Sequence, residues 1–149
     1  IILPCSERWK VRKKMYLDNQ INDLIKRLRL SSTLGGIKFV LAYPYSRRPC
    51  ALSSRVAVIV PESMELESIG VDCLDYAGKA AIGINLFSPY RLGSPSAFDT
   101  MQKIVEQAIT PMVTKIYVSP LETDESTECY RLKAVLTFDV DLSKEEENE

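Results

Sequence analysis

Few residues in this chain are able to do chemistry, and the missing types exclude whole classes of enzyme. The 149 residues include no histidine, which removes Ser-His-Asp and Cys-His nucleophile systems, histidine ligands to metals and histidine general bases. Cys5, Cys50, Cys73 and Cys129 form no C-x-x-C pair, so nothing indicates a structural zinc site or a thioredoxin-type motif. We expect these cysteines to be reduced and buried rather than disulfide-bonded.

The acidic and glycine-containing segments match no catalytic signature. Neither G-x-x-x-x-G-K-[ST] nor G-x-G-x-x-G occurs, and no lysine follows an acidic residue at the D/E-x-K spacing of restriction-type nucleases. Asp139 and Asp141 could hold a divalent cation from one strand face, but the solvated end of a strand is the favoured interpretation. Asp72 and Asp75 could act as an acid–base pair, yet no apolar residue is placed to raise a pKa there. We therefore predict no enzymatic activity, no cofactor and no metal site.

Two short clusters combine tyrosine with arginine. They consist of Tyr43, Tyr45, Arg47 and Arg48 in the first cluster, which prolines stiffen, and of Tyr90 and Arg91 in the second. Such residues can stack on bases, and they are also favoured at protein–protein interfaces. Because the net charge is only −1, we expect both clusters to be assembly surfaces and nucleic-acid binding to be unlikely.

Charge is distributed unevenly along the chain. Residues 7–29 carry eight basic and three acidic side chains, whereas residues 121–149 carry ten acidic and three basic ones. This asymmetry is consistent with nucleic-acid contact at the basic end, with head-to-tail complementarity between copies, or with two solvated ends.

Two helices are predicted around these segments. Leu17, Ile21, Leu24, Ile25 and Leu28 repeat at helical spacing, and the helix should end before Gly35-Gly36. In the second helix Ser94 is expected to be the cap, Pro95 the first helical residue and Asp99 part of the first turn, with Pro111 after the end. Its apolar stripe is expected to be Phe98, Met101, Val105, Ala108 and Ile109.

Six strands are expected from runs of β-favouring residues. They cover residues 37–42, 55–60, 64–71, 80–87, 115–120 and 130–140, with Pro61 ending the second and a polar loop at 121–129. The order α-β-β-β-β-α-β-β predicts an α+β domain, with two main helices packed on a mostly antiparallel sheet. The apolar runs are too short to cross a membrane.

Residues 15–142 are expected to form a single domain. Residues 1–14 share no period with the rest, and back-translation of residues 10–14 yields a purine-rich stretch before Met15, as in a ribosome-binding site. We therefore expect residues 1–14 to be a leader or an added extension. Residues 143–149 should form an acidic tail.

One segment carries a resemblance to a known family. The run Ile-Asn-Leu-Phe-Ser-Pro-Tyr-Arg-Leu-Gly-Ser at residues 84–94, with Ala-Tyr-Pro at 42–44 and the closing hairpin, resembles small proteins from tail gene clusters of phages and phage-derived particles. The resemblance implies a structural virion protein, a tail terminator or tail-completion subunit. It further implies a hexameric ring of identical copies that contacts the tail tube and a sheath or connector protein. The location it implies is a virion or phage-like tail particle assembled in the bacterial cytoplasm.

Two other classes of function stay open at this point. The chain could be a head–tail connector or nucleic-acid-contacting module that uses Arg47, Arg48 and the basic first helix. It could also be a small-molecule-binding regulatory α+β domain, although no glycine-rich or polar pocket motif is present.

Overall fold

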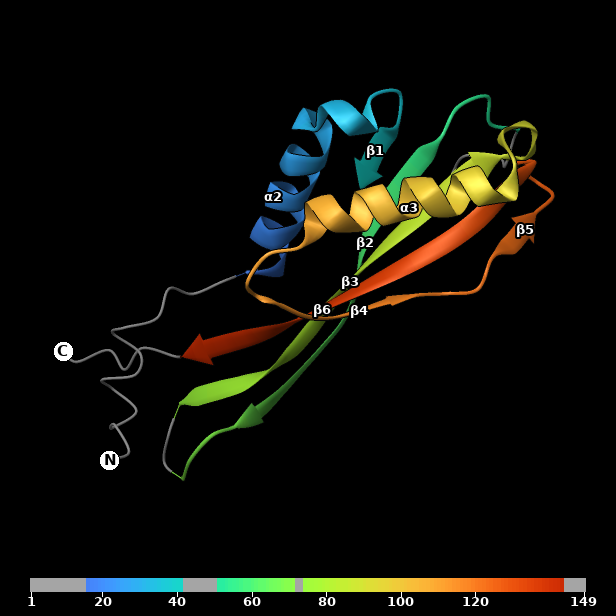
Figure 1. Cartoon of the computed structure of the whole chain (residues 1–149). Helices are drawn as coiled ribbons and strands as arrows, with labels where there is room; N and C mark the ends of the chain where they lie inside the picture. Colours follow the sequence, from blue (N-terminus) through green and yellow to red (C-terminus); the bar gives the residue numbers. More distant parts are fainter. Residues whose placement is uncertain (1–15, 42–50, 72–73, 144–149) are drawn as a thin grey trace.

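The computed structural model describes residues 16–41, 51–71 and 74–143. Its elements are α2 (Leu17–Leu30), η1 (Ser32–Leu34), β1 (Lys38–Leu41), β2 (Val56–Ser68), β3 (Asp75–Pro89), η2 (Tyr90–Leu92), α3 (Ser94–Ala108), β4 (Val113–Val118), β5 (Glu122–Asp124) and β6 (Cys129–Ser143), as labelled in Figure 1.

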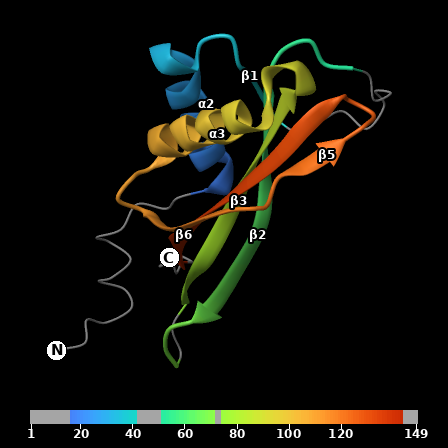
Figure 2. The ribbon, with the colours of Figure 1, turned by 45° about the vertical axis from the view of Figure 1, so that its right-hand side comes forward.

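The strands form one sheet in the order β1-β2-β3-β6-β4, with β5 also paired to β6. Every pairing is antiparallel except that of β1 with β2. Both helices lie on the same face of this sheet (Figures 1 and 2). The predicted α+β class, with two helices on a mostly antiparallel sheet, is confirmed.

The core lies between the helices and the sheet. α2 buries Ile21, Leu24, Ile25 and Leu28, the residues whose spacing predicted it. Alternate residues of the central strands face these side chains, because successive side chains of a strand point to opposite faces. The strand residues of this core are Ala57, Ile59, Ala80, Ile82, Ile84, Leu86, Leu132, Ala134, Leu136, Phe138 and Val140.

The segment at 64–71, expected to be a separate strand, is the second half of β2 up to Ser68. β1 pairs with β2 only as far as Ile59, and the register shifts between Pro61 and Ser63. Pro61 therefore lies at a bulge where β2 has no β1 partner, a position that tolerates the missing N–H. The strand continues through this bulge, so the expectation that Pro61 ends it is wrong.

The expected details of α3 also need correction. Gly93, with φ 83°, occupies the N-cap position and Ser94 is the first helical residue, so Ser94 does not cap the helix. The first turn contains no acidic residue; Asp99 instead pairs with Lys103 one turn later. Phe98, expected to be buried, is exposed, and Ile109 lies beyond the end of the helix. The buried stripe consists of Ala97, Thr100, Met101, Ile104 and Ala108.

The polar loop expected at residues 121–129 contains the short strand β5. β3 and β6 are each 15 residues long, and together with β2 they continue past the helices. Figures 1 and 2 show these strands projecting on the side away from η2 and β5. We call residues 62–71, 74–79 and 139–142 the arm.

Candidate assembly surfaces

The turn between β3 and α3 is a densely hydrogen-bonded corner. We call residues 88–96, together with Arg55 and Tyr130, the η2 corner. The Tyr90 N–H donates to the Glu128 carbonyl at 3.1 Å, and the Gly93 N–H donates to the Tyr90 carbonyl at 3.0 Å. The positive φ of Gly93 is a conformation that only glycine adopts at little cost. The corner thus joins β3, α3 and the end of the β5–β6 turn.

Arg55 links three elements at this corner. Its Nε donates to Ser88 Oγ at 3.3 Å and one terminal nitrogen donates to Ser96 Oγ. Ser88 is fully buried, so its hydroxyl depends on protein partners, because a buried polar group without a partner destabilises the fold. Sequence inspection missed Arg55, since its two serine partners are 33 and 41 residues away.

Tyr90 is half-buried against Tyr130. The ring centroids are 5.0 Å apart with an interplanar angle of 69°, an edge-to-face geometry. Burial and the nearby Glu125 carboxylate raise the pKa of the Tyr90 phenol, so this side chain stays neutral. Tyr90 therefore packs within the corner, while part of its side chain remains accessible.

Arg91 is exposed, and its guanidinium donates to the Ser53 carbonyl. Tyr90 and Arg91 lie together as the sequence suggested, and their use as assembly contacts stays a prediction. The other cluster, Tyr43, Tyr45, Arg47 and Arg48, lies outside the described residues.

The arm exposes large apolar side chains at the opposite end of the molecule. Val71, at its tip, is 92% exposed, and Tyr76 is 45% exposed. Other exposed apolar residues of the arm are Met64, Ile69 and Leu74. Exposed apolar patches are typical of interaction surfaces, so the arm is a candidate assembly surface.

The strand register divides the arm into two faces. Met64 lies opposite the core residue Ala80, and Leu66 lies opposite Gly78, so these side chains continue the helix-covered face of the sheet. Glu65 and Glu67 point to the other face. Asp139 and Asp141 share that face through their partners Lys79 and Ala77. One face is therefore apolar and the other acidic.

The alternation of Met64 and Leu66 with Glu65 and Glu67 in the sequence indicates a strand with one apolar and one acidic face. The sequence suggested a strand there but not its projection beyond the helices. Within the described residues the outer edge of β2 has no partner strand beyond Ile59. Unpaired strand edges are available for pairing with another chain.

An ion pair crosses the central strand on the face of the sheet away from the helices. Lys133 Nζ of β6 lies 2.7 Å from Glu62 Oε1 of β2, with both side chains partly buried. A Cβ added to Gly83 of β3 would lie 2.2 Å from that same oxygen. The absence of a side chain at Gly83 makes room for this pair.

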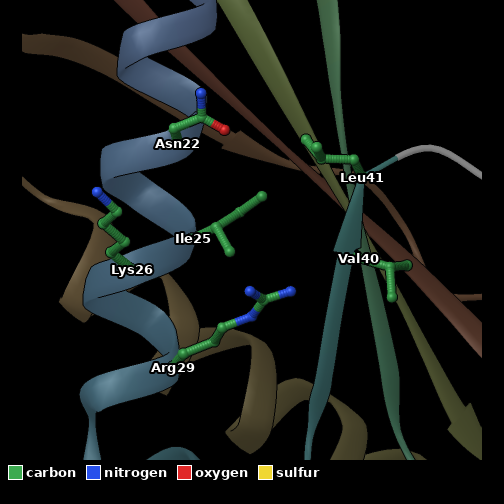
Figure 3. Close-up of a pocket in the computed structure, with 6 residues that line it drawn as sticks. All are labelled: Asn22, Ile25, Lys26, Arg29, Val40 and Leu41. Atoms are coloured by element: carbon green, nitrogen blue, oxygen red, sulfur yellow. The ribbon is translucent and has the colours of Figure 1, made fainter.

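A groove runs between α2 and the edge strand β1. Its lining residues are Asn22, Ile25, Lys26, Arg29, Val40 and Leu41, shown in Figure 3, and its volume is about 490 Å³. Ile25 and Arg29 point from α2 toward β1 (Figure 3), and Arg29 donates to the Phe39 carbonyl at 2.8 Å. Leu41 is 52% exposed. Val40 packs toward the other face of the sheet, with Val56 and Val58. The apolar side chains that face the groove are therefore Ile25 and Leu41, beside the basic Lys26 and Arg29.

The acidic residues considered for catalysis are placed separately. Asp139 pairs with Lys79 at 3.0 Å on the exposed strand face. Asp75 is buried, and it has an interaction partner; Asp72 lies outside the described residues. In the described part of the chain, no group of three or more His, Cys, Asp or Glu residues could hold a metal ion.

Cys129 is free and fully buried. Burial raises the pKa of its thiol, which makes it a poor nucleophile at neutral pH. This agrees with the expectation for that cysteine; the other three lie outside the described residues. No helix among the described residues is long and apolar enough to cross a membrane.

Comparison with known proteins gave likenesses to solved structures. No family model matches the chain, and no curated protein matches it. One solved chain that resembles it has 15% sequence identity and a TM-score of 0.46, with 88% of this chain and 100% of that chain covered.

Proposed function

We propose that this protein is a structural ring subunit of a phage-like tail, a tail terminator or tail-completion protein. The observation that carries the proposal is the arm, which projects beyond the helices with exposed apolar side chains and with a strand edge that has no partner among the described residues. A domain with its own core, as this one has, needs no such arm for folding. A subunit that contacts neighbours needs one.

Two further features support the proposal. The run at residues 84–94 that resembles tail proteins forms the end of β3, η2 and the start of α3, where the Tyr90–Arg91 turn presents an exposed arginine. The described titratable residues offer no convergent catalytic group, which suits a structural role. The partners we propose are further copies of this chain and the tail tube, within a tail particle assembled in the bacterial cytoplasm.

Native mass measurement with electron microscopy tests this function. We expect closed rings with a mass six times the 16.8 kDa of one chain, and these rings should cap tail tubes added in solution. A protein that stays monomeric at all concentrations and caps no tube would contradict the proposal. DNA binding that weakens steeply with salt would favour the connector function instead.

A further inference from the structure

The arm and the groove between α2 and β1 have complementary chemistry. The acidic face of the arm carries Glu65 and Glu67, and the groove is bordered by Lys26 and Arg29 beside the exposed Leu41. Among the described residues, none of these four charged side chains belongs to an ion pair. Each surface thus lacks an opposite charge that the other offers.

The two surfaces belong to different ends of the molecule. In Figures 1 and 2 the tip of the arm points away from α2 and β1, and the arm is a continuation of a sheet whose strands are fixed by pairing. A chain therefore cannot place its arm tip in its own groove. A second copy can, and within the described residues the outer edge of its β1 has no partner strand, although Arg29 already donates to the Phe39 carbonyl there.

We propose that the arm of one copy docks in the α2–β1 groove of the next copy. The acidic face of the arm then lies over Leu41, and Glu65 and Glu67 face the Lys26 and Arg29 cations. Since the two contacting surfaces differ, the interface is head-to-tail. Its repetition gives a ring where the rotation between neighbours closes and a filament where it does not, and the proposed ring requires the first. This inference rests on the proposed function in that it names the interface of the proposed ring.

Charge reversal tests the interface. The variant E65K/E67K reverses the arm, and K26E/R29E reverses the groove. Each variant alone places like charges in contact, which is strongly unfavourable at an interface. We expect each to weaken self-association at least tenfold, measured by sedimentation of the full chain. The melting temperature should be unchanged for E65K/E67K and somewhat lower for K26E/R29E, which also loses the Arg29 hydrogen bond to the Phe39 carbonyl.

Mixing the two variants provides the decisive measurement. A reversed arm matches a reversed groove, and the natural arm of the groove variant matches the natural groove of the arm variant. The mixture should therefore recover oligomers in which the variants alternate and are present in equal numbers. Isotope labelling of one variant makes this ratio readable by native mass spectrometry.

The matched control is Glu106→Lys, an exposed residue of α3 outside both surfaces. It changes the charge as much as Glu67→Lys does, but it should leave self-association within twofold. An equal effect of the two single changes, or rings that persist in both double variants, would overturn the proposed interface while leaving the ring function standing. Alternating rings that fail to cap tail tubes would contradict the tail function alone, and a wild-type chain that never self-associates would overturn both.

Discussion

The η2 corner and the arm lie at opposite ends of the sheet and differ in how many contacts their side chains make with the rest of the molecule. At the corner, Arg55 and Tyr90 connect neighbouring elements through hydrogen bonds and ring packing. In the arm, the strands pair with one another, but the outer edge of β2 has no partner strand in the described part of the chain and Val71 is exposed. Residues of the corner are therefore held by side-chain contacts to other elements, whereas the arm leaves large side chains exposed. Substitutions at the two ends should separate folding from assembly.

The largest effect is expected where the arm itself depends on close strand approach. A Cβ on Gly78 would lie 1.7 Å from the Glu65 carbonyl oxygen, so Gly78→Val must separate β2 from β3. We expect it to lower the free energy of unfolding by about 2–3 kcal/mol, as overpacking does, and to abolish assembly. Chemical denaturation and native mass spectrometry check this. Ala77→Val, on the other face of the same strand, is the control and should change little.

At the corner, Arg55→Ala should lower the free energy of unfolding by about 2 kcal/mol, because the buried Ser88 hydroxyl loses a charged partner. Urea denaturation measures the change. Arg131→Ala, which removes an exposed arginine paired with Glu122, should cost less than about 0.5 kcal/mol. Equal losses for the two arginines would mean that the corner is no more tightly connected than the surface.

The ion pair between Glu62 and Lys133 should contribute less than Arg55. A double-mutant cycle with Glu62→Gln and Lys133→Met is expected to show a coupling of about 0.5–1 kcal/mol that falls as salt is added. The more exposed pair of Lys79 with Asp139 should show a smaller coupling. A coupling unaffected by salt would contradict an electrostatic origin.

The smallest effect on folding is expected at the arm tip. Val71→Ser should change the free energy of unfolding by less than about 0.5 kcal/mol, because the side chain is already in solvent. It should nevertheless weaken self-association measurably in sedimentation. Val58→Ser, which places a hydroxyl at a buried position of the sheet, serves as the contrast and should destabilise the fold. A stability loss at Val71 equal to that at Val58 would show that the tip is packed.

Much of the fold could be predicted because local spacing carries it. The repeat from Leu17 to Leu28 places its apolar side chains on one side of a helix whatever lies next to it. The alternation within residues 130–140 places Leu132, Ala134, Leu136 and Phe138 on one strand face for the same reason. These assignments need no knowledge of the neighbours.

The candidate surfaces were less predictable because they depend on neighbours distant in sequence. Phe98 matched a helical stripe, yet it is exposed because the neighbouring face of α3, with Ala97 and Ile104, packs on the sheet. Arg55 was not recognised, since its serine partners come from β3 and α3. The Tyr90–Arg91 turn was found from residue type alone, and its use in assembly stays a prediction.

The sequence by itself determined the class of the domain, the two helices and the alternating faces of the main strands, because these follow from spacing along one segment. Only the tertiary structure decided that β2 continues through Pro61, since that proline is tolerated only where β1 has ended. It likewise decided that β2, β3 and β6 outrun the helices. How far the strands extend beyond the helices depends on how segments distant in sequence pack together. No local sequence pattern determines this length.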